Sequence, residues 1–446
     1  MLKQQKIFFD FLRFCIGSAK EIPGSLKEVD WKEIYAIAKK QCLVGILFDS
    51  IKKLPAEYVG MKKELLLQWM AESQMLEKAN VRLNDAAIQV SEWFRKKGFR
   101  SCILKGQGNA LMYPNPYSRS PGDIDIWVEG GDKRVISFVR SISPHEKACY
   151  HHIEFQSYKG VEVEVHYRPS FLLCFWNNRK LQKYYEKVKE EQFSHRMMLG
   201  EQGEIAIPTV EFNLIFQLTH IYAHLMNEGI GLRQLVDYYY VLCDFYKVYQ
   251  NFSKTHPSSL TLKGGSTAFP KPLSPQGTGD VTAPPRRSEP LRSKVGGPSK
   301  VSPDCAGWDR LSIEGDNSAG STTAVTSSAS TALDVVQKEL KELGLWKFAG
   351  GIMYIMQEVF GMPASRLIVP PNEKYGRFVL NEVLEAGNFG RHDARNRFGR
   401  SQLGHNLQRV YRDIRLVRYF PAEALCEPLF RTWHFFWRLK YKKLNN

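Results

Sequence analysis

Apolar residues recur at helical spacing through the first part of the chain. Trp31 and Ile34 lie three residues apart on one expected helix face, and similar pairs follow up to about residue 97. The last helix of this part is expected over about residues 75–97. It ends in Lys-Lys-Gly, where Gly98 can adopt the left-handed conformation that stops a helix. Residues 1–97 are therefore predicted to form an N-terminal helical region.

The pattern then changes to short apolar runs mixed with short helical stretches. Lys159-Gly160 separates two alternating runs and is expected to be a hairpin turn. Strands mixed with helices over about a hundred residues indicate an α/β or α+β core, predicted over residues 98–207. The expected strands are residues 101–104, 123–128, 151–158 and 161–167, and the expected helices are residues 106–113 and 133–142.

Helical periodicity returns after Pro208, in two parts separated by a segment of different composition. Residues 208–252 are expected to be the first part of a helical domain, and residues 332–446 its second part. Residues 253–331 are rich in Ser, Thr, Gly and Pro and hold few large apolar side chains. Such a segment buries too little surface to offset its ordering entropy, so a disordered insertion is predicted. A mispredicted coding segment is the alternative explanation.

The charge balance narrows the range of partners. The chain of 446 residues has 62 Lys and Arg against 46 Asp and Glu, a net charge of +16. An excess of this size favours nucleic acid, anionic lipid headgroups or nucleotide phosphates, and does not choose among them. No membrane span is expected, because the longest uncharged apolar stretch, 348–356, is far below the roughly 20 residues required. Eight cysteines without a Cys-x-x-Cys pair favour reduced thiols and a cytoplasmic protein.

The strongest chemical signal is the pair Asp123 and Asp125, two residues apart on an apolar strand. At about 3.3 Å per residue their Cα atoms lie roughly 6 to 7 Å apart on one strand face, so the carboxylates can converge. Like charges placed together repel unless a cation joins them, and magnesium prefers such oxygen ligands. The alternative for any Asp-x-Asp is an exposed strand end or a turn.

Two neighbouring segments strengthen the metal interpretation. Lys105-Gly106 ends an expected strand and opens a helix, where backbone N–H groups and a cation can hold phosphates. Downstream, Glu162, Glu164 and His166 alternate with valines and share one strand face. Either glutamate can supply the third carboxylate that a two-metal site requires. His166 is expected to line the site or to have a structural role.

The order of these motifs resembles a known family. LKGQGNALMYPNPYSRSPGDIDIWV followed by VEVEVHYRP is similar to the uncharacterised bacterial nucleotidyltransferase family of the DNA polymerase beta superfamily. The later HIYAHLMNEGIGLRQLVDYYYVL, Gly344-Leu345 and Tyr419-Phe420-Pro421 also resemble that family's helical part. The resemblance implies an α+β, polymerase beta-like nucleotidyltransferase fold with a mixed sheet core and with N-terminal and C-terminal helical regions.

The resemblance also implies roles for individual residues. Asp123, Asp125 and Glu164 would be the catalytic residues and would ligate two magnesium ions, with manganese as the alternative metal. Lys105, Gly106 and Arg119 would bind the nucleotide, with loop bracing as a second role for Arg119. The wider superfamily has Gly-Ser where this chain has Lys105-Gly106, so the usual serine contact to the triphosphate is missing here. The residues expected to line the substrate site are Glu162, His166, His220, His224 and Arg233.

The implied activity is transfer of a nucleoside monophosphate from a nucleoside triphosphate to a hydroxyl acceptor, either a small molecule or a protein. One alternative is an RNA-end nucleotidyltransferase that uses the basic C-terminal helices, for which no RNA-binding motif is present. A second alternative is a catalytically silent fold used for binding, such as an antitoxin-like module. His220 and His224 lie four residues apart, but zinc is not expected there because the glutamate of His-Glu-x-x-His is absent.

Overall fold

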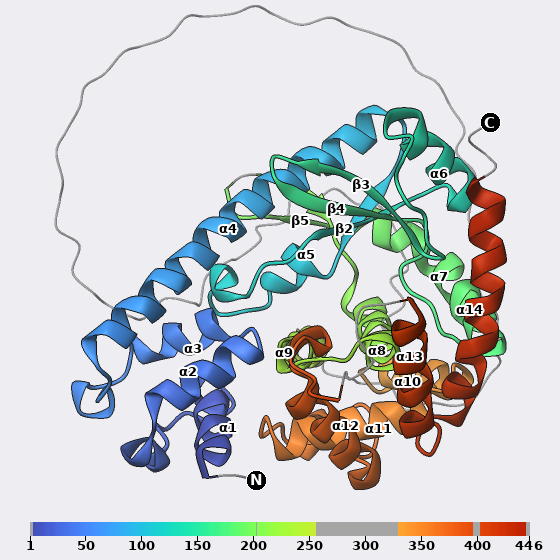
Figure 1. The fold of residues 1–446 in the computed structure, drawn as a ribbon. Helices are drawn as coiled ribbons and strands as arrows, with labels where there is room; N and C mark the ends of the chain where they lie inside the picture. Colours follow the sequence, from blue (N-terminus) through green and yellow to red (C-terminus); the bar gives the residue numbers. More distant parts are fainter. Residues whose placement is uncertain (1–2, 202, 256–328, 396–401, 443–446) are drawn as a thin grey trace, which may run out of the picture. The chain divides into compact units, whose positions relative to one another are not determined.

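The computed structural model describes residues 3–201, 203–255, 329–395 and 402–442 (Figure 1). Most of the predicted insertion, residues 256–328, lies outside the described residues. At its two edges the helices continue further than expected, because α9 ends at Thr255 and α10 begins at Ala329. Among the described residues, no helix combines the length and the apolar character needed to cross a bilayer.

The N-terminal region is helical, with one long helix at its end. Its helices are α1 (Lys3–Cys15), α2 (Trp31–Lys40), α3 (Val44–Ile51) and α4 (Lys63–Lys96). Asp30 caps α2 by accepting hydrogen bonds from the amides of Lys32 and Glu33. The helix expected at 75–97 begins twelve residues earlier, because no glycine or proline interrupts the chain between Lys62 and Lys97.

The sheet core follows α4, and its strands are arranged in the order β1-β2-β4-β3. The two central strands, β2 and β4, are parallel, and each edge strand is antiparallel to its neighbour. The mixed sheet expected from the sequence is therefore present. The strands are β1 (Ser101–Leu104), β2 (Ile124–Val128), β3 (His152–Tyr158) and β4 (Val161–His166), and the helices between them are α5 (Gly106–Ala110) and α6 (Gly131–Ile142).

The two faces of the sheet pack against different helices. Ile126 and Val165 belong to one apolar cluster with Phe94 of α4 and Val135 of α6. Trp127, on the opposite face of β2, packs against Phe193 and Phe212 with ring centroids 4.7 and 5.9 Å apart. Polar residues in the same alternating positions as Trp127 therefore point toward the helices that follow the sheet.

Lys159 and Gly160 form the hairpin turn between β3 and β4. Their φ angles of 51° and 79° are both positive, as a two-residue turn that matches the strand twist requires. A register shift lies between Phe155 and Tyr158 of β3. The turn was expected from the sequence, and it lies at the end of the hairpin that borders the pocket described below.

One helix of the core was not expected. Helix α7 covers Phe175–Ser194 and is followed by the small hairpin of β5 (Arg196–Met198) and β6 (Glu204–Ala206). Most of the α7 surface is polar, so its few apolar residues do not show a clear helical spacing in the sequence. The buried residues Leu181, Tyr185 and Gln192 nevertheless have the spacing of one helix face.

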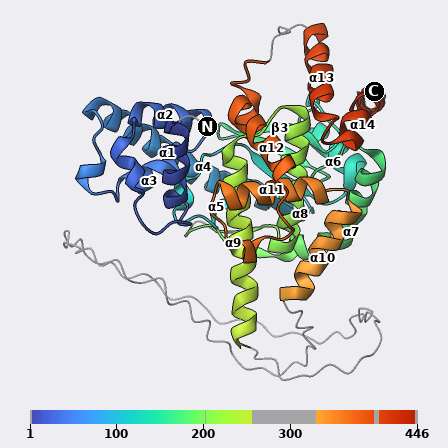
Figure 2. The same cartoon turned by 90° about the horizontal axis from the view of Figure 1, so that it is seen from below.

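The remaining helices form the second helical region. They are α8 (Val210–Asn227), α9 (Leu232–Thr255), α10 (Ala329–Glu342), α11 (Trp346–Glu358), α12 (Glu373–Ala386), α13 (Gln402–Leu416) and α14 (Pro421–Lys442). Thr209 caps α8, because its side chain accepts a hydrogen bond from the Phe212 amide. Helices α10 and α13 pack against α8 although they are far from it in sequence (Figure 2).

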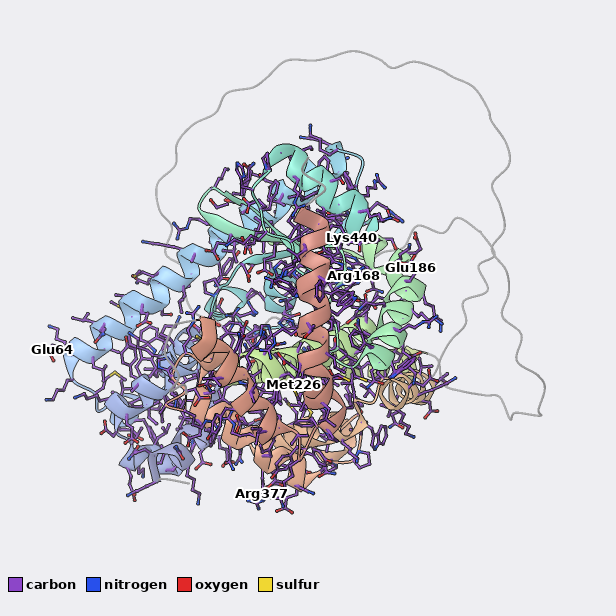
Figure 3. The ribbon with its side chains drawn as sticks, turned by 45° about the vertical axis from the view of Figure 1, so that its right-hand side comes forward. Glu64, Arg168, Glu186, Met226, Arg377 and Lys440 are labelled. Carbon is purple, nitrogen blue, oxygen red and sulfur yellow. The ribbon has the colours of Figure 1, made fainter. Side chains whose placement is uncertain are left out.

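The last helix returns to the sheet core. In Figure 3, α14 runs along the near side of the molecule, with Lys440 near its C-terminal end. Tyr441 is buried in the apolar cluster on the α6 side of the sheet, where Trp437 also packs. Asp132 of α6 accepts a hydrogen bond from Arg168 at 2.9 Å and another from the Tyr441 hydroxyl. The C-terminal helix thereby fixes the edge of the core that holds α6.

Candidate active site

Three carboxylates meet at the centre of the sheet. Asp125 of β2 is the direct register partner of Glu164 of β4, and Asp123 immediately precedes β2. One carboxylate oxygen from each of the three residues lies within 4.8 Å of the other two. The parallel pairing of β2 and β4 therefore places Glu164 beside Asp123 and Asp125, which precede it by 41 and 39 residues. Glu162 is exposed and does not belong to this group.

Asp125 is buried and is surrounded by cations. Its Oδ1 atom lies 2.9 Å from Lys105 Nζ and 2.9 Å from His166 Nε2. Burial acts to raise the pKa of the Asp125 carboxyl, but the charges and hydrogen bonds of Lys105 and His166 outweigh it, and the net shift is strongly downward. Asp125 is therefore ionised over the physiological pH range.

Asp123 and Glu164 differ from Asp125 in their partners. The negative charge of Asp125 raises the pKa of Asp123, and burial adds to that effect. Burial also acts to raise the pKa of Glu164, yet contacts with His166 at 3.4 Å and His152 at 3.2 Å give a net downward shift. Repulsion between Asp123 and Asp125 is what a bound divalent cation would relieve.

His166 connects two of the carboxylates. Burial alone would lower the pKa of the imidazole, but its hydrogen bonds to Asp125 and Glu164 raise that pKa to about 9. His166 as a whole is 2% exposed. The centroid of its ring lies 5.3 Å from that of His151 and 5.2 Å from that of His152. His166 therefore positions and neutralises the acidic group from its inner side, in agreement with a structural or site-lining role.

Lys105 reaches the carboxylates from a strained backbone position. Its φ of 50° and ψ of −137° lie in a region that residues with a Cβ rarely adopt, which costs about 1–3 kcal/mol. The next residue, Gly106, also has a positive φ of 41° and opens α5. The side chain of Lys105 then spans from Asp125 to His220, whose Nε2 lies 3.2 Å from Nζ.

His220 and His224 form a pair on α8. Their rings meet edge to face with centroids 4.3 Å apart, and His224 Nδ1 lies 3.4 Å from Glu228. Burial, followed by the Lys105 charge, lowers the pKa of His220 well below its ordinary value, so this imidazole is neutral. Neither histidine belongs to a group that could hold a metal ion among the described residues. His220 therefore orients Lys105.

Arg119 is occupied by a buried partner. Its Nε and Nη2 atoms donate to the two oxygens of Asp237, both at 2.8 Å, and the pair is almost fully buried. The Tyr113 hydroxyl donates to the same carboxylate at 2.5 Å. The loop between α5 and β2 is thereby attached to α9, so the geometry favours the bracing role of Arg119 over a phosphate contact.

Arg233 lies in the same region without such a partner. No hydrogen bond or ion pair joins its guanidinium to another of the residues that the structure describes. Burial lowers its pKa, and the neighbouring Arg119 charge adds to that effect. A Cβ at Gly122 would lie 3.2 Å from Arg233 Nη2, so a larger residue there would move the guanidinium by a few tenths of an ångström.

A pocket of about 610 Å³ opens in front of the acidic group. Asp123, Asp125, Lys105 and Gly106 line its inner wall. Most of the other charged groups in its lining are cationic, and they come from elements far apart in sequence: Arg82, Arg119, Lys159, Arg233 and Arg391. A cavity with carboxylates at its base and cations around them suits a ligand that carries both metal-binding and phosphate groups.

Glu162 and Phe389 also line the pocket. Glu162 is exposed at the end of the β3–β4 hairpin. Phe389 adopts a positive φ of 53° and packs against His224 with ring centroids 5.0 Å apart. The sequence did not point to Phe389, since nothing in a short Asn-Phe-Gly segment predicts its approach to the pocket.

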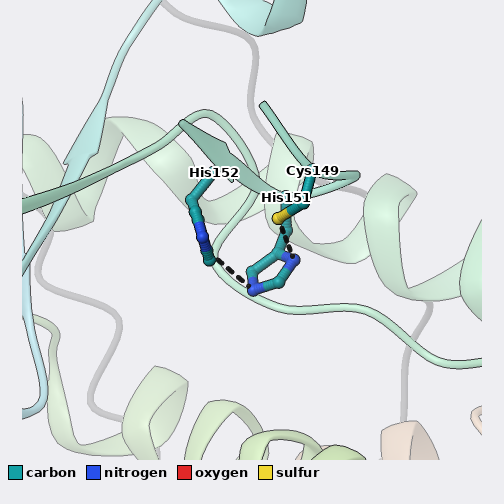
Figure 4. Close-up of side chains that lie close together, drawn as sticks. All are labelled: Cys149, His151 and His152. Atoms are coloured by element: carbon teal, nitrogen blue, oxygen red, sulfur yellow. Dashed lines mark hydrogen bonds between the residues drawn. The ribbon is translucent and has the colours of Figure 1, made fainter. Parts of the chain in front are cut away.

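Three further side chains gather behind the carboxylates and were not expected from the sequence. Cys149 Sγ lies 3.4 Å from His151 Nδ1, and His152 Nδ1 lies 3.1 Å from His151 Nε2 (Figure 4). His152 also contacts Glu164, which connects this group to the acidic one. The available signal was their spacing within the four residues Cys-Tyr-His-His immediately before and at the start of β3.

The arginines of the C-terminal helices are mostly engaged within the protein. Arg409 lies 2.8 Å from Asn227 Oδ1 and 3.5 Å from Glu427. Arg415 pairs with Glu382 at 3.1 Å, and Arg412 is buried. Arg418 is exposed. Because three of these four side chains are paired or buried, they do not form the open basic surface that an RNA-binding role would use.

Comparison with known proteins identifies one family. The model of a family described as uncharacterised nucleotidyltransferase matches residues 27–248, which include every strand, the acidic group and all of the charged residues that line the pocket except Arg391. Helices α10 to α14 lie outside the matched range. No curated protein and no solved structure matches the chain.

Proposed function

Residues 27–248 of this chain belong to the family of uncharacterised nucleotidyltransferases, and from this premise we propose that the protein transfers a nucleoside monophosphate from a nucleoside triphosphate to a hydroxyl acceptor. The acceptor is a small hydroxylated molecule or a protein side chain. The observation that carries the proposal is the convergence of Asp123, Asp125 and Glu164 beside a basic pocket that Asp123 and Asp125 line.

The acidic group fits a hard divalent cation. Three carboxylates supply oxygen ligands within 4.8 Å of one another, and the raised pKa of Asp123 reflects a repulsion that a cation would remove. We assign Asp123, Asp125 and Glu164 as the ligands of two magnesium ions, for which manganese could substitute. When bound, the ions would activate the acceptor hydroxyl and stabilise the departing pyrophosphate.

The cations of the pocket hold the triphosphate. Arg233, which has no partner among the described residues, binds the phosphates, and the backbone at Gly106 lets them approach the start of α5. Lys105 neutralises Asp125 when the nucleotide is absent and donates to the phosphates when it is bound. Arg119 keeps the loop that carries Asp123 attached to α9 through Asp237.

The acceptor oxygen attacks the α-phosphorus in line with the departing pyrophosphate. A new phosphorus–oxygen bond forms to the acceptor, and the bond between the α-phosphorus and the bridging oxygen breaks. Glu164, whose side chain is 31% exposed compared with 4% for Asp125, is the proposed acceptor of the hydroxyl proton. The product is an acceptor that carries a nucleoside monophosphate.

The proposal is tested with nucleoside triphosphates labelled at the α-phosphate. Purified protein is incubated in cell extract with magnesium, and labelled macromolecules and small molecules are separated. We expect a labelled species with the wild type and none with Asp123→Asn or Glu164→Gln. Glu162→Gln should retain labelling, because Glu162 lies outside the acidic group. Glu129→Gln is the matched control, since Glu129 follows the same strand at its other end.

Two outcomes would contradict the proposal. Labelling that is unchanged in Asp123→Asn would show that the acidic group does not catalyse the reaction. Failure of the wild type to bind magnesium and any nucleoside triphosphate in a calorimetric titration would favour the silent binding module instead. The paired arginines of α13 give no support to the RNA-end alternative.

A further inference from the structure

A second group of metal-binding side chains lies beside the acidic one. Cys149, His151 and His152 each place one ligand atom within 4.8 Å of the other two. Figure 4 shows the His151 ring between the Cys149 sulfur and the His152 ring. In a tetrahedral site, bond lengths of 2.0 to 2.3 Å imply ligand separations of roughly 3.3 to 3.6 Å. The two close contacts reach opposite nitrogens of His151: Nδ1 lies 3.4 Å from Cys149 Sγ, and Nε2 lies 3.1 Å from His152 Nδ1. One ion binds a single nitrogen of this ring, so the three ligand atoms, which lie within 4.8 Å of one another, would draw closer together when it binds.

The backbone around the three residues is fixed by hydrogen bonds. The Cys149 amide donates to the His152 carbonyl at 2.9 Å, which closes the turn that carries all three side chains. The His151 carbonyl accepts from the amides of Tyr167 and Arg168 at 3.0 and 3.2 Å. The Tyr167 hydroxyl also bonds to the Cys149 carbonyl. A turn held in this way keeps the ligand atoms together before any ion binds.

The chemistry of the donors differs from that of the acidic group. A thiolate and two imidazoles are soft and borderline ligands that select zinc and related transition metals, whereas magnesium requires oxygen ligands. We propose that Cys149, His151 and His152 bind one transition-metal ion of the zinc class, at a site separate from the magnesium site. Binding releases the Cys149 thiol proton to solvent and leaves one position of the tetrahedron for water or a fourth ligand.

The proposed site has a structural connection to the reaction centre. His152 Nδ1 lies 3.2 Å from Glu164 Oε2, and His152 is the register partner of His166. An ion on His152 would therefore fix the position of the residue that contacts the third carboxylate. The inference does not depend on nucleotide transfer, because its evidence is the ligand geometry alone.

Cobalt(II) is the probe for the test, because a thiolate ligand gives it a charge-transfer absorption. Full-length protein is freed of metal with a chelator under reducing conditions and titrated with cobalt(II). We expect this absorption to saturate at one equivalent, to be lost on adding zinc, and to persist in millimolar magnesium. Cys149→Ser should abolish it, and His152→Gln should abolish it or shift saturation to much higher cobalt concentrations.

Two controls separate this site from other cysteines and from the acidic group. Cys243→Ser removes a thiol of similar exposure elsewhere, and Asp123→Asn removes one of the carboxylates; both should keep the absorption. The proposal is overturned if wild-type protein gives no thiolate absorption, if Cys149→Ser retains it, or if Asp123→Asn loses it. Circular dichroism of the metal-free variants establishes that each is folded.

Discussion

The ammonium group of Lys105 lies 2.9 Å from the Oδ1 atom of Asp125, in the middle of the acidic group. This side chain supplies, within the protein itself, part of the positive charge that a divalent cation would bring. Lys105 and a metal ion therefore compete to neutralise the same carboxylate. The strained backbone of Lys105 and its contact with His220 both serve to hold the ammonium group there.

Competition of this kind predicts how Lys105→Met responds to magnesium. The variant leaves Asp125 with His166 as its remaining cationic partner, so it should lower the melting temperature without magnesium. Magnesium should then raise the melting temperature by more in the variant than in the wild type, because it replaces the lost charge. Differential scanning fluorimetry over a magnesium series measures both effects. Lys338→Met, at an exposed helix pair, is the control and should respond like the wild type.

An equal magnesium response in Lys105→Met and the wild type would contradict this competition. Nucleotide transfer should fall in the variant whatever the metal response, because the same ammonium group is expected to contact the phosphates. The two measurements therefore separate the role of Lys105 toward Asp125 from its role toward the nucleotide.

The buried pair of Arg119 and Asp237 predicts a large loss of stability. Arg119→Met leaves the Asp237 carboxylate buried with only the Tyr113 hydroxyl as a direct partner. Removal of one member of a buried pair costs about 3–5 kcal/mol of unfolding free energy. Urea unfolding followed by circular dichroism measures it. The matched Arg196→Met breaks an exposed pair with Glu204 and should cost less than about 1 kcal/mol. Equal losses in both variants would refute the bracing role.

Local sequence patterns predicted much of the fold, because their signals depend on neighbouring residues alone. The alternation around Glu164 identified β4, and Lys159-Gly160 identified the hairpin turn. The long α4 and the polar α7 were harder to delimit, since the start of α4 lacks a capping side chain and α7 buries only a narrow stripe. In both cases tertiary packing decides what local propensity leaves open.

The candidate site required contacts that no local pattern encodes. Asp123 and Asp125 could be placed together from their spacing, but the choice of Glu164 over Glu162 follows from the register between β2 and β4. The capture of Arg119 by Asp237 joins residues 118 positions apart. Sequence spacing does not reveal such a partner, so Arg119 could equally have been a phosphate ligand or a brace.

Glu423 predicts a dependence of stability on pH. Burial raises the pKa of this carboxyl to about 7, although the amides of Cys174 and Leu173 donate to it. A raised folded-state pKa means that the protonated acid is favoured in the folded protein. Its stabilising contribution is therefore complete below the unfolded pKa near 4.5 and is lost as the pH rises to about 7.

The expected loss is about 3 kcal/mol of unfolding free energy between these two pH values. Glu423→Gln keeps an oxygen that can accept the two amide hydrogen bonds and removes the ionisation. Its unfolding free energy, measured in urea from pH 4.5 to 8, should fall less steeply than that of the wild type. Parallel curves for the two proteins would show that Glu423 does not titrate in this range.

Arg233 predicts a separation between nucleotide binding and stability. Its guanidinium lines the pocket and has no hydrogen-bond or ion-pair partner within the described part of the chain, while burial and Arg119 both disfavour its charge. Arg233→Met should therefore leave the unfolding free energy unchanged or higher in the absence of nucleotide. A charge-assisted hydrogen bond to a phosphate contributes about 1.5–3 kcal/mol, so the dissociation constant for a non-hydrolysable nucleoside triphosphate should rise roughly 10- to 100-fold.

Isothermal titration calorimetry measures that constant, with Arg196→Met as the control. Loss of stability without a change in nucleotide affinity would assign Arg233 to the same structural role as Arg119, and the phosphates would then have to be held by the remaining cations of the pocket.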